Sequence, residues 1–321
     1  MFVTKFFDSQ KMPLVVEPSQ ASKSSSFESL VALSINRREL FQDKLLKHGA
    51  LLFRGFEVDA PNKFEQFVRA FSGKELLNYA GGVSPRIELG GNVYTSTEYP
   101  SQFMLSLHNE LSYSDQYPHQ IYFCCLIAPL ENGETPIADS REILKKIDRE
   151  IVRLFKEKQI RYDRNLYADA GSGYAWQDAF ETADKSLVEN YCRKAGINFE
   201  WRVGDGRLRL SQTRPATIVH PLTNEEVWFN QAEGFHPSAL DKKTYDSLIE
   251  FISEEDFRLN SRFGDGTPFD VAMLNQIRAA IKREMIVFPW QTGDVLVLDN
   301  LLAAHGRMPF KGPRKIILAM T

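Results

Sequence analysis

The C-terminal stretch "GDVLVLDNLLAAHGRMPFKGPRKIILAM", Gly293 to Met320, decides the fold class. Short runs of apolar residues alternate there with glycine, proline and asparagine, a pattern typical of short strands joined by tight turns. Further back, the run "HQIYFCCLIA", His119 to Ala128, is continuously apolar, as in a strand covered on both faces. These two regions predict a strand-rich core.

Helical patterns lie outside these strand-rich parts. One surrounds Phe41 and is expected to end at Gly49, and another carries Phe64, Phe67, Val68 and Phe71 on one face. A third, "REILKKIDREIVRLFKEK", is expected to be one helix capped by Asp139 or Ser140. Since strands and helices do not alternate regularly, we expect a mainly β fold with helical additions (α+β), either a β-barrel or a jelly roll.

We expect a single domain over residues 1–321, with lid-like inserted loops around 78–106 and 160–214, because long glycine-bearing loops often close over sites. The formal net charge of −3 gives no sign of a nucleic-acid-binding surface. Three cysteines without a CxxC spacing argue against a disulfide framework. With a poor signal-peptide pattern and no membrane-spanning apolar stretch, a cytoplasmic protein without a membrane partner is expected.

The segment "SLHNELSYSDQYPHQ" places His108 and Glu110 two residues apart. In an extended strand, residues i and i+2 point to the same side, so both side chains can reach one ion. His305, near the C-terminus, is the best candidate for a third ligand. Two histidines and one carboxylate form the facial triad that binds non-haem Fe(II) and leaves positions open. Taken singly, each histidine is more often a hydrogen-bonded structural residue.

Two further residues fit this hypothesis. Arg314, nine residues after His305, offers a guanidinium fork for the distal carboxylate of a chelating cosubstrate. Thr135, in "GETP", can donate a hydroxyl hydrogen bond to the same group. Alone, Arg314 would read as a surface ion pair and Thr135 as part of a helix-entry turn. Their occurrence together with the three ligand candidates favours the functional interpretation.

Several segments together resemble the taurine dioxygenase-like family of Fe(II)/2-oxoglutarate-dependent oxygenases, and within it the subgroup of the syringomycin-type aspartyl β-hydroxylase. The resemblance covers most of the chain, from about "HGALLFRGF" to the end. The segments that carry it are "HNELSYSDQYPHQIYF", "ENGETPIADSR", "RPATIVHPLTNEEVWFNQ" and "GDVLVLDNLLAAHGRMPFKGPRK".

The resemblance implies a double-stranded β-helix, a jelly roll, that uses Fe(II), 2-oxoglutarate and O2. By position, it makes His108, Glu110 and His305 the catalytic iron ligands. It makes Thr135 a contact of 2-oxoglutarate and Arg314 the partner of its C5 carboxylate.

Two positions depart from the taurine enzyme. Glu110 stands where that enzyme has aspartate, and Leu318 stands where it has an arginine that binds the substrate sulfonate. A sulfonate substrate is therefore not expected. Because Glu110 is neither glycine nor alanine, no ligand position is vacated for halide, which argues against the related halogenation outcome.

Candidate substrate contacts are Asn109, Asn230, Gln231 and Arg307, each with a structural alternative. If residues 108–110 form a strand, Asn109 points away from the iron. Asn230 and Gln231 either line the site or satisfy strand ends, and Arg307 meets either a substrate carboxylate or a protein acid.

The subgroup resemblance implies hydroxylation of an unactivated C–H bond in an amino acid, or in an aminoacyl or peptidyl unit on a carrier protein, in natural-product biosynthesis. The same chemistry could instead desaturate or cyclise a small carboxylic acid. An alternative of another class is a jelly-roll protein that binds a metal or ligand without turnover. A last alternative is a structural or interaction module, in which the candidate site residues are only packed polar groups.

Overall fold

Strands from both ends of the chain meet in one eight-stranded sheet. The structure is a computed structural model that describes residues 2–7, 10–19, 25–97, 99–169 and 174–321. Neighbouring strands of this sheet are antiparallel except for β2 and β3. In order across the sheet, the strands are β1 (Phe2–Lys5), β2 (Leu14–Pro18), β3 (Ala50–Phe53), β16 (Val295–Asp299), β7 (Gln120–Ile127), β19 (Lys315–Met320), β5 (Val93–Thr95) and β4 (Glu88–Gly90).

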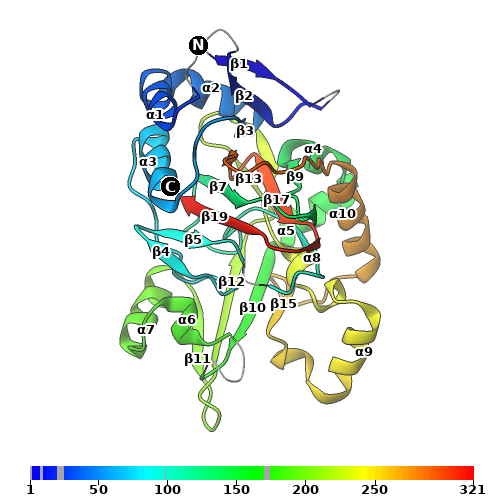
Figure 1. Ribbon diagram of the computed structural model, residues 1–321. Helices are drawn as coiled ribbons and strands as arrows, with labels where there is room; N and C mark the ends of the chain where they lie inside the picture. Colours follow the sequence, from blue (N-terminus) through cyan, green and yellow to red (C-terminus); the bar gives the residue numbers. More distant parts are fainter. Residues whose placement is uncertain (1, 8–9, 20–24, 98, 170–173) are drawn as a thin grey trace.

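One face of this sheet is covered by three helices, α1 (Phe27–Asn36), α2 (Arg38–His48) and α3 (Pro61–Ser72), which lie together along one side of the molecule (Figure 1). Alternate residues of the central strands point to them, so that Phe53 and Val297 pack against helix residues such as Phe41 and Phe71. The predicted helix around Phe41 is confirmed and ends at Gly49, whose φ of 71° is left-handed and favours glycine.

The opposite face of the large sheet packs into the main core of the protein. Leu296 and Phe123 point to that side, and the ring of Phe123 lies 5.0 Å from the ring of His305. His305 belongs to a small three-stranded sheet whose strands, in order, are β6 (Leu105–His108), β17 (Ala303–Arg307) and β9 (Ile137–Asp139). Two layers of strands therefore enclose the region of the predicted site.

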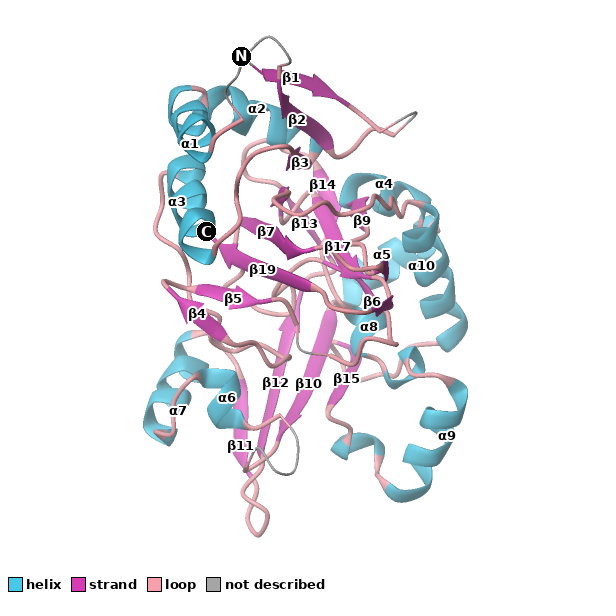
Figure 2. Cartoon of the chain, viewed as in Figure 1, coloured by secondary structure: helices cyan, strands magenta, loops and turns pink. Residues whose placement is uncertain are grey.

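A further sheet extends away from the large one, with helices on its flanks (Figure 2). Its strands, in order, are β11 (Asn198–Trp201), β12 (Leu208–Arg214), β10 (Ile160–Leu166) and β15 (Leu259–Phe263). Two strand pairs complete the sheets: β13 (Thr217–Val219) with β14 (Glu226–Trp228), and β8 (Glu131–Asn132) with β18 (Phe310–Lys311). The remaining helices are α4 (Ser140–Lys146), α5 (Arg149–Lys158), α6 (Trp176–Phe180), α7 (Lys185–Lys194), α8 (Ala232–Phe235), α9 (Lys242–Phe251) and α10 (Val271–Arg283).

The prediction of one long helix over residues 141–158 is wrong, because the segment forms α4 and α5 with a break between them. Ile147 has extended backbone angles, and the side chain of Asp148 accepts hydrogen bonds from the N–H groups of Glu150 and Ile151. An aspartate that caps new helical N–H groups starts a second helix. The predicted cap of the first helix is confirmed, since Asp139 accepts from the N–H group of Arg141.

The segment 160–214, expected as an inserted loop, contains β10, α6, α7, β11 and β12, with residues 170–173 outside the described part. The segment 78–106 carries the short strands β4, β5 and β6, as its loose pattern predicted, with residue 98 outside the described part. A lid role for either segment stays a prediction. The whole is a mixed α+β architecture, and none of its described helices is long and apolar enough to cross a membrane.

Candidate metal centre

Two histidines face one another across a strand pair at the centre of the site. His108 ends β6 and is the register partner of His305 in β17, with ring centroids 4.5 Å apart. Gly306 permits this approach, because a Cβ atom there would lie 2.5 Å from the carbonyl oxygen of Leu105. Glu110 lies beyond the end of β6, in a turn rather than in the strand. One ligand atom from each of the three side chains lies within 4.8 Å of the others.

The turn that carries Glu110 is held by Asn300, a buried residue in the connection between β16 and β17. Its Oδ1 accepts a hydrogen bond of 2.7 Å from the N–H group of Glu110. Its Nδ2 donates to the carbonyl oxygens of Glu110 at 3.0 Å and of Pro118 at 2.8 Å. This clamp ties Glu110 to the strand pair that presents His305.

Replacing Asn300 with alanine is expected to destabilise the protein by roughly 2–4 kcal/mol, because three buried hydrogen bonds are lost and their partners are left unsatisfied. Chemical denaturation of the metal-free protein measures this change. Asn190→Ala, on the exposed face of α7, serves as the control and is expected to change stability by less than about 0.5 kcal/mol. Equal stability of the two variants would refute the role assigned to Asn300.

Hydrogen bonds and burial set the charge state of the ligands. Nδ1 of His108 lies 2.8 Å from the carbonyl oxygen of Ser106, which as acceptor requires the proton on Nδ1 and leaves Nε2 for a metal. Burial, helped by the nearby His305, lowers the pKa of His108 to about 4, so that it is neutral at pH 7. Burial opposes ionisation of Glu110, but Arg86 and His305 together lower the pKa of its carboxyl well below its usual range.

This donor set fits Fe(II). Two imidazoles and one carboxylate converge, with their ligand atoms within 4.8 Å of one another, and all three are protein ligands of the kind that non-haem iron enzymes use. Three protein ligands leave coordination positions open, as a site for a chelating cosubstrate and O2 requires.

A narrow pocket next to the triad ends at Arg314. The Nε group of Arg314 donates to the carbonyl oxygen of Gly133 at 2.8 Å, and Nη1 donates to Oγ of Ser96 at 3.3 Å. No carboxylate of a described residue lies within 4 Å of this guanidinium. Burial and the nearby charge of Arg307 lower the pKa of Arg314 to about 10, so it remains a cation at pH 7. A largely buried cation without a protein counter-ion suits an external carboxylate.

Thr135 lines the same pocket and is buried. Its Oγ1 accepts a hydrogen bond of 3.1 Å from Nε1 of Trp290. Because indole nitrogen only donates, the hydroxyl proton of Thr135 remains available for an acceptor in the pocket. Thr135 and Arg314 thus present donors to one space beside His108 and His305.

The four predicted substrate residues lie in different places. Asn109 donates to Oγ of Ser140 and to the carbonyl oxygen of Asn300, and Asn230 donates to the carbonyl oxygen of Ala216. Neither side chain is among the residues that line the cavities at the triad. Both are occupied in holding loops.

Gln231 lines the cavity in front of His108, while its Nε2 donates to the carbonyl oxygen of Asn109. Arg307 borders the narrow pocket, but two of its nitrogens donate to the carbonyl oxygens of Thr97, Tyr99, Pro100 and Phe103. Arg307 therefore holds the backbone of these four residues next to the narrow pocket.

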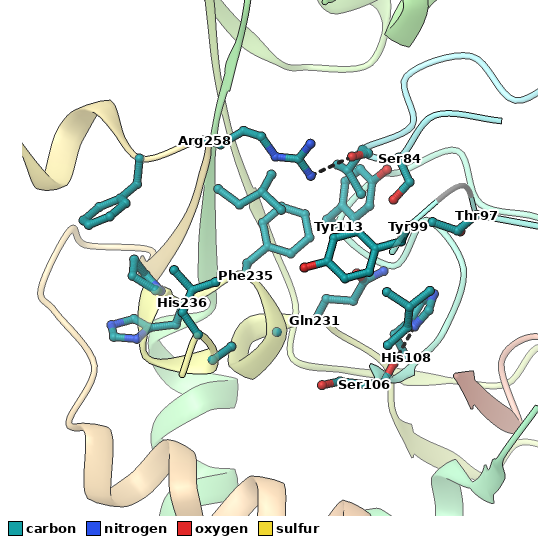
Figure 3. Close-up of a pocket in the computed structure, with 18 of the residues that line it drawn as sticks. Ser84, Thr97, Tyr99, Ser106, His108, Tyr113, Gln231, Phe235, His236 and Arg258 are labelled. Carbon is teal, nitrogen blue, oxygen red and sulfur yellow. Dashed lines mark hydrogen bonds between the residues drawn. The ribbon is translucent and has the colours of Figure 1, made fainter. Parts of the chain in front are cut away.

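In front of the triad lies a cavity of about 450 Å³ (Figure 3). Its walls come from the 79–113 segment, from the region of α8 and α9, and from the start of β15. The triad residues His108 and Glu110 reach its wall together with Tyr99, Tyr113, Phe235 and Arg258. A mostly apolar cavity that opens onto potential metal ligands has the size and lining of a small-molecule site.

Sequence reasoning missed Arg86, which is buried beside the triad. Its Nη2 lies 2.9 Å from Oε2 of Glu110, and its guanidinium lies 3.8 Å from the ring centre of Tyr79. Among the described residues, its Nε and Nη1 have no hydrogen-bond partner. Arg86 compensates the charge of Glu110 and borders both cavities. Nothing in "SPRIELGG" marks this arginine as different from a surface one.

Fold and site together define the class of protein. Residues 14–321 match the family described as taurine catabolism dioxygenase TauD, TfdA family, and the chain belongs to that family. It is an Fe(II)/2-oxoglutarate-dependent oxygenase whose cosubstrates are 2-oxoglutarate and O2. The non-catalytic alternatives are thereby set aside.

Two proteins of known sequence and one solved structure are similar to this chain. Over 276 residues the chain is 42% identical to the dapdiamide synthesis protein DdaC of Enterobacter agglomerans, covering 86% of this chain and 83% of the relative. It is 32% identical over 326 residues to a clavaminate synthase-like protein of Arabidopsis thaliana, with 98% and 95% covered. A solved structure of PvcB, an Fe, alpha-ketoglutarate dependent oxygenase from an isonitrile synthetic pathway, has the same fold, with a TM-score of 0.56 and 13% identity over 100% of this chain and 90% of that one.

Proposed function

We propose that this oxygenase hydroxylates an unactivated C–H bond of an amino acid, or of an aminoacyl or peptidyl unit on a carrier protein, in natural-product biosynthesis. In this proposal His108, Glu110 and His305 hold the iron, and Thr135 and Arg314 hold 2-oxoglutarate. The observation that carries it is that three features adjoin one another: the His108, Glu110 and His305 triad, the narrow pocket lined by Arg314, which has no carboxylate of a described residue within 4 Å, and the cavity in front of His108.

Relatives and residue identities support the choice of substrate and outcome. The name of DdaC connects that relative with dapdiamide synthesis, and PvcB belongs to an isonitrile synthetic pathway. Glu110 keeps the carboxylate ligand, which favours oxygen transfer over halogen transfer. Leu318 is an apolar, buried residue of β19, which disfavours a sulfonate substrate at that position.

The residues of the chain position and protect the reactants. When bound, Fe(II) and 2-oxoglutarate supply the oxidising power, which is drawn from O2. Arg314 and Thr135, which line the same pocket as His108 and His305, would hold the far carboxylate of the cosubstrate. Ser106 holds the tautomer of His108, and Arg86 keeps Glu110 ionised. The aromatic wall formed by Tyr99, Tyr113 and Phe235 limits water near the substrate.

We also propose that the core is a double-stranded β-helix, or jelly roll. The support is the packing of the β6–β17–β9 sheet against the face of the eight-stranded sheet that carries Phe123. Residues 1–321 would form one domain around it, with 78–106 and 160–214 as inserted lid-like segments. For 78–106, the support is the contacts of Arg307 to Thr97, Tyr99, Pro100 and Phe103.

The proposal predicts a one-oxygen mass gain in the right substrate. The protein is incubated with Fe(II), 2-oxoglutarate and O2 and a panel of amino acids, offered free, N-acylated or loaded on carrier proteins, and the products are analysed by mass spectrometry. Succinate is measured in the same samples. Hydroxylation adds one oxygen, whereas desaturation or ring closure removes two hydrogens, so the mass change separates these outcomes.

His305→Ala is the control for adventitious oxidation, and its products are expected to fall to background. A two-hydrogen loss as the main product would contradict hydroxylation. The proposed substrate class would be contradicted if no member of the panel increased succinate formation while a compound unrelated to amino acids gave a product.

A further inference from the structure

Among the described residues that line the large cavity, each charged side chain except Arg258 has an oppositely charged partner. Arg86 pairs with Glu110, Glu233 lies 3.5 Å from Arg278, and Asp256 pairs with Arg202. Arg258 also lines the cavity, but no acidic side chain of a described residue lies within 4 Å of it. Among the described residues, Arg258 is therefore the charged side chain of this cavity that has no oppositely charged partner, and it lies outside the triad and its cosubstrate pocket.

The surroundings of Arg258 keep it in place without neutralising it. Its Nη2 donates a hydrogen bond of 3.0 Å to the carbonyl oxygen of Val83. The ring centre of Tyr174 lies 6.0 Å from its guanidinium carbon. Burial lowers the pKa of Arg258, and nearby tyrosines, Tyr174 first among them, oppose the shift. Its Nε and Nη1 groups donate no hydrogen bond to a described residue, so they can donate to a ligand in the cavity.

The position of Arg258 differs from that of the groups at the iron site. In Figure 3, Arg258 and His108 approach the cavity from opposite sides, and the side chains of Tyr99 and Tyr113 lie between them in this view. Arg258 does not border the narrow pocket that ends at Arg314. It therefore lies outside the pocket proposed for the cosubstrate, and it lines the cavity proposed for the substrate.

We infer that Arg258 binds the free α-carboxylate of the substrate at the side of the cavity away from the iron ligands. One guanidinium with donors to spare matches one carboxylate in charge and in its paired oxygens. A substrate held in this way is a released acid, because a carboxyl group tied to a carrier protein as a thioester has no negative charge. The inference rests on the proposed function and narrows it to untethered amino-acid derivatives.

The experiment compares matched ligands by ligand-observed NMR. N-acetyl amino acids, their C-terminal amides and their N-acetylcysteamine thioesters are titrated anaerobically into protein loaded with Fe(II) and 2-oxoglutarate. For each amino acid in the panel that binds, the N-acetyl acid is expected to bind at least tenfold more tightly than the corresponding amide or thioester. Arg258→Gln is expected to weaken the acid at least tenfold and leave the amide nearly unchanged, which removes the preference.

Two variants separate charge recognition from a structural role. Arg258→Lys keeps the positive charge and is expected to keep part of the preference for the acid, with KM changed more than kcat. Arg153→Gln, on the exposed surface of α5, is the control and should behave as wild type. If Arg258 served only to hold Val83, its loss would weaken acid and amide alike.

The visible band of bound Fe(II) and 2-oxoglutarate, recorded on the same samples, separates two kinds of failure. Its absence in wild type would overturn the proposed function itself. With the band present, tighter binding of a thioester than of its acid, an unchanged preference in Arg258→Gln, or binding by no acid in the panel would overturn the role of Arg258.

Discussion

Arg314→Met is expected to raise the KM for 2-oxoglutarate by roughly 30-fold or more, because removing one partner of a buried charge pair costs about 2–5 kcal/mol. The physical reason is the surroundings of Arg314, which has bonds to Gly133 and Ser96 but no described carboxylate within 4 Å. Its charge is available to the far carboxylate of the cosubstrate. Succinate formation at varied 2-oxoglutarate concentrations measures the effect.

Arg314→Lys is the matched comparison, since it keeps the charge and loses the planar fork. An intermediate KM is expected. The iron affinity of both variants should remain close to wild type, because Arg314 contributes no ligand atom to the triad. A KM in Arg314→Met within twofold of wild type would remove Arg314 from the cosubstrate site.

His305→Ala is expected to lower Fe(II) affinity by roughly 100-fold or more, since loss of even an outer-shell partner costs about 10- to 100-fold. The remaining ligands, His108 and Glu110, offer only two donors, and Arg86 then competes with the metal for the Glu110 carboxylate. The rate of turnover is expected to fall because less Fe(II) is bound. Anaerobic calorimetric titration with Fe(II) measures the affinity.

His48→Ala is the control for the loss of a histidine as such. His48 ends α2 and has its ring against Phe6, outside the triad and its cavities. Its substitution should leave Fe(II) affinity unchanged. Equal affinities in His305→Ala and wild type would show that iron binds elsewhere.

Clear patterns of apolar residues, either a continuous run or a helical repeat, made the elements predictable. The apolar run at His119–Ala128 became β7, and Phe64 and Phe71 became the buried face of α3. The break after Ile147 was missed because the i, i+4 pattern of isoleucines continues through it, while Asp148 starts a new helix. Periodicity reports which face is buried and does not show whether the backbone is continuous.

The triad was predictable because ligand chemistry restricts both residue type and number. The clamp by Asn300 and the pairing of Arg86 with Glu110 were not, since they depend on segments that only the fold brings together. Arg258 is a similar case, because only the fold shows that it lines the large cavity and that no acidic side chain of a described residue lies within 4 Å of it. The sequence shows where the arginines are, but it does not show which of them have an acidic side chain beside them in the fold.

We propose that His108, Glu110 and His305 hold iron in a way that lets 2-oxoglutarate chelate it. The most direct measurement is the visible absorption spectrum after anaerobic addition of Fe(II) and 2-oxoglutarate to wild type and to His108→Ala. We predict a weak charge-transfer band in the wild type that is absent from the variant. An equal band in both, or no band in a folded wild type, would contradict the claim.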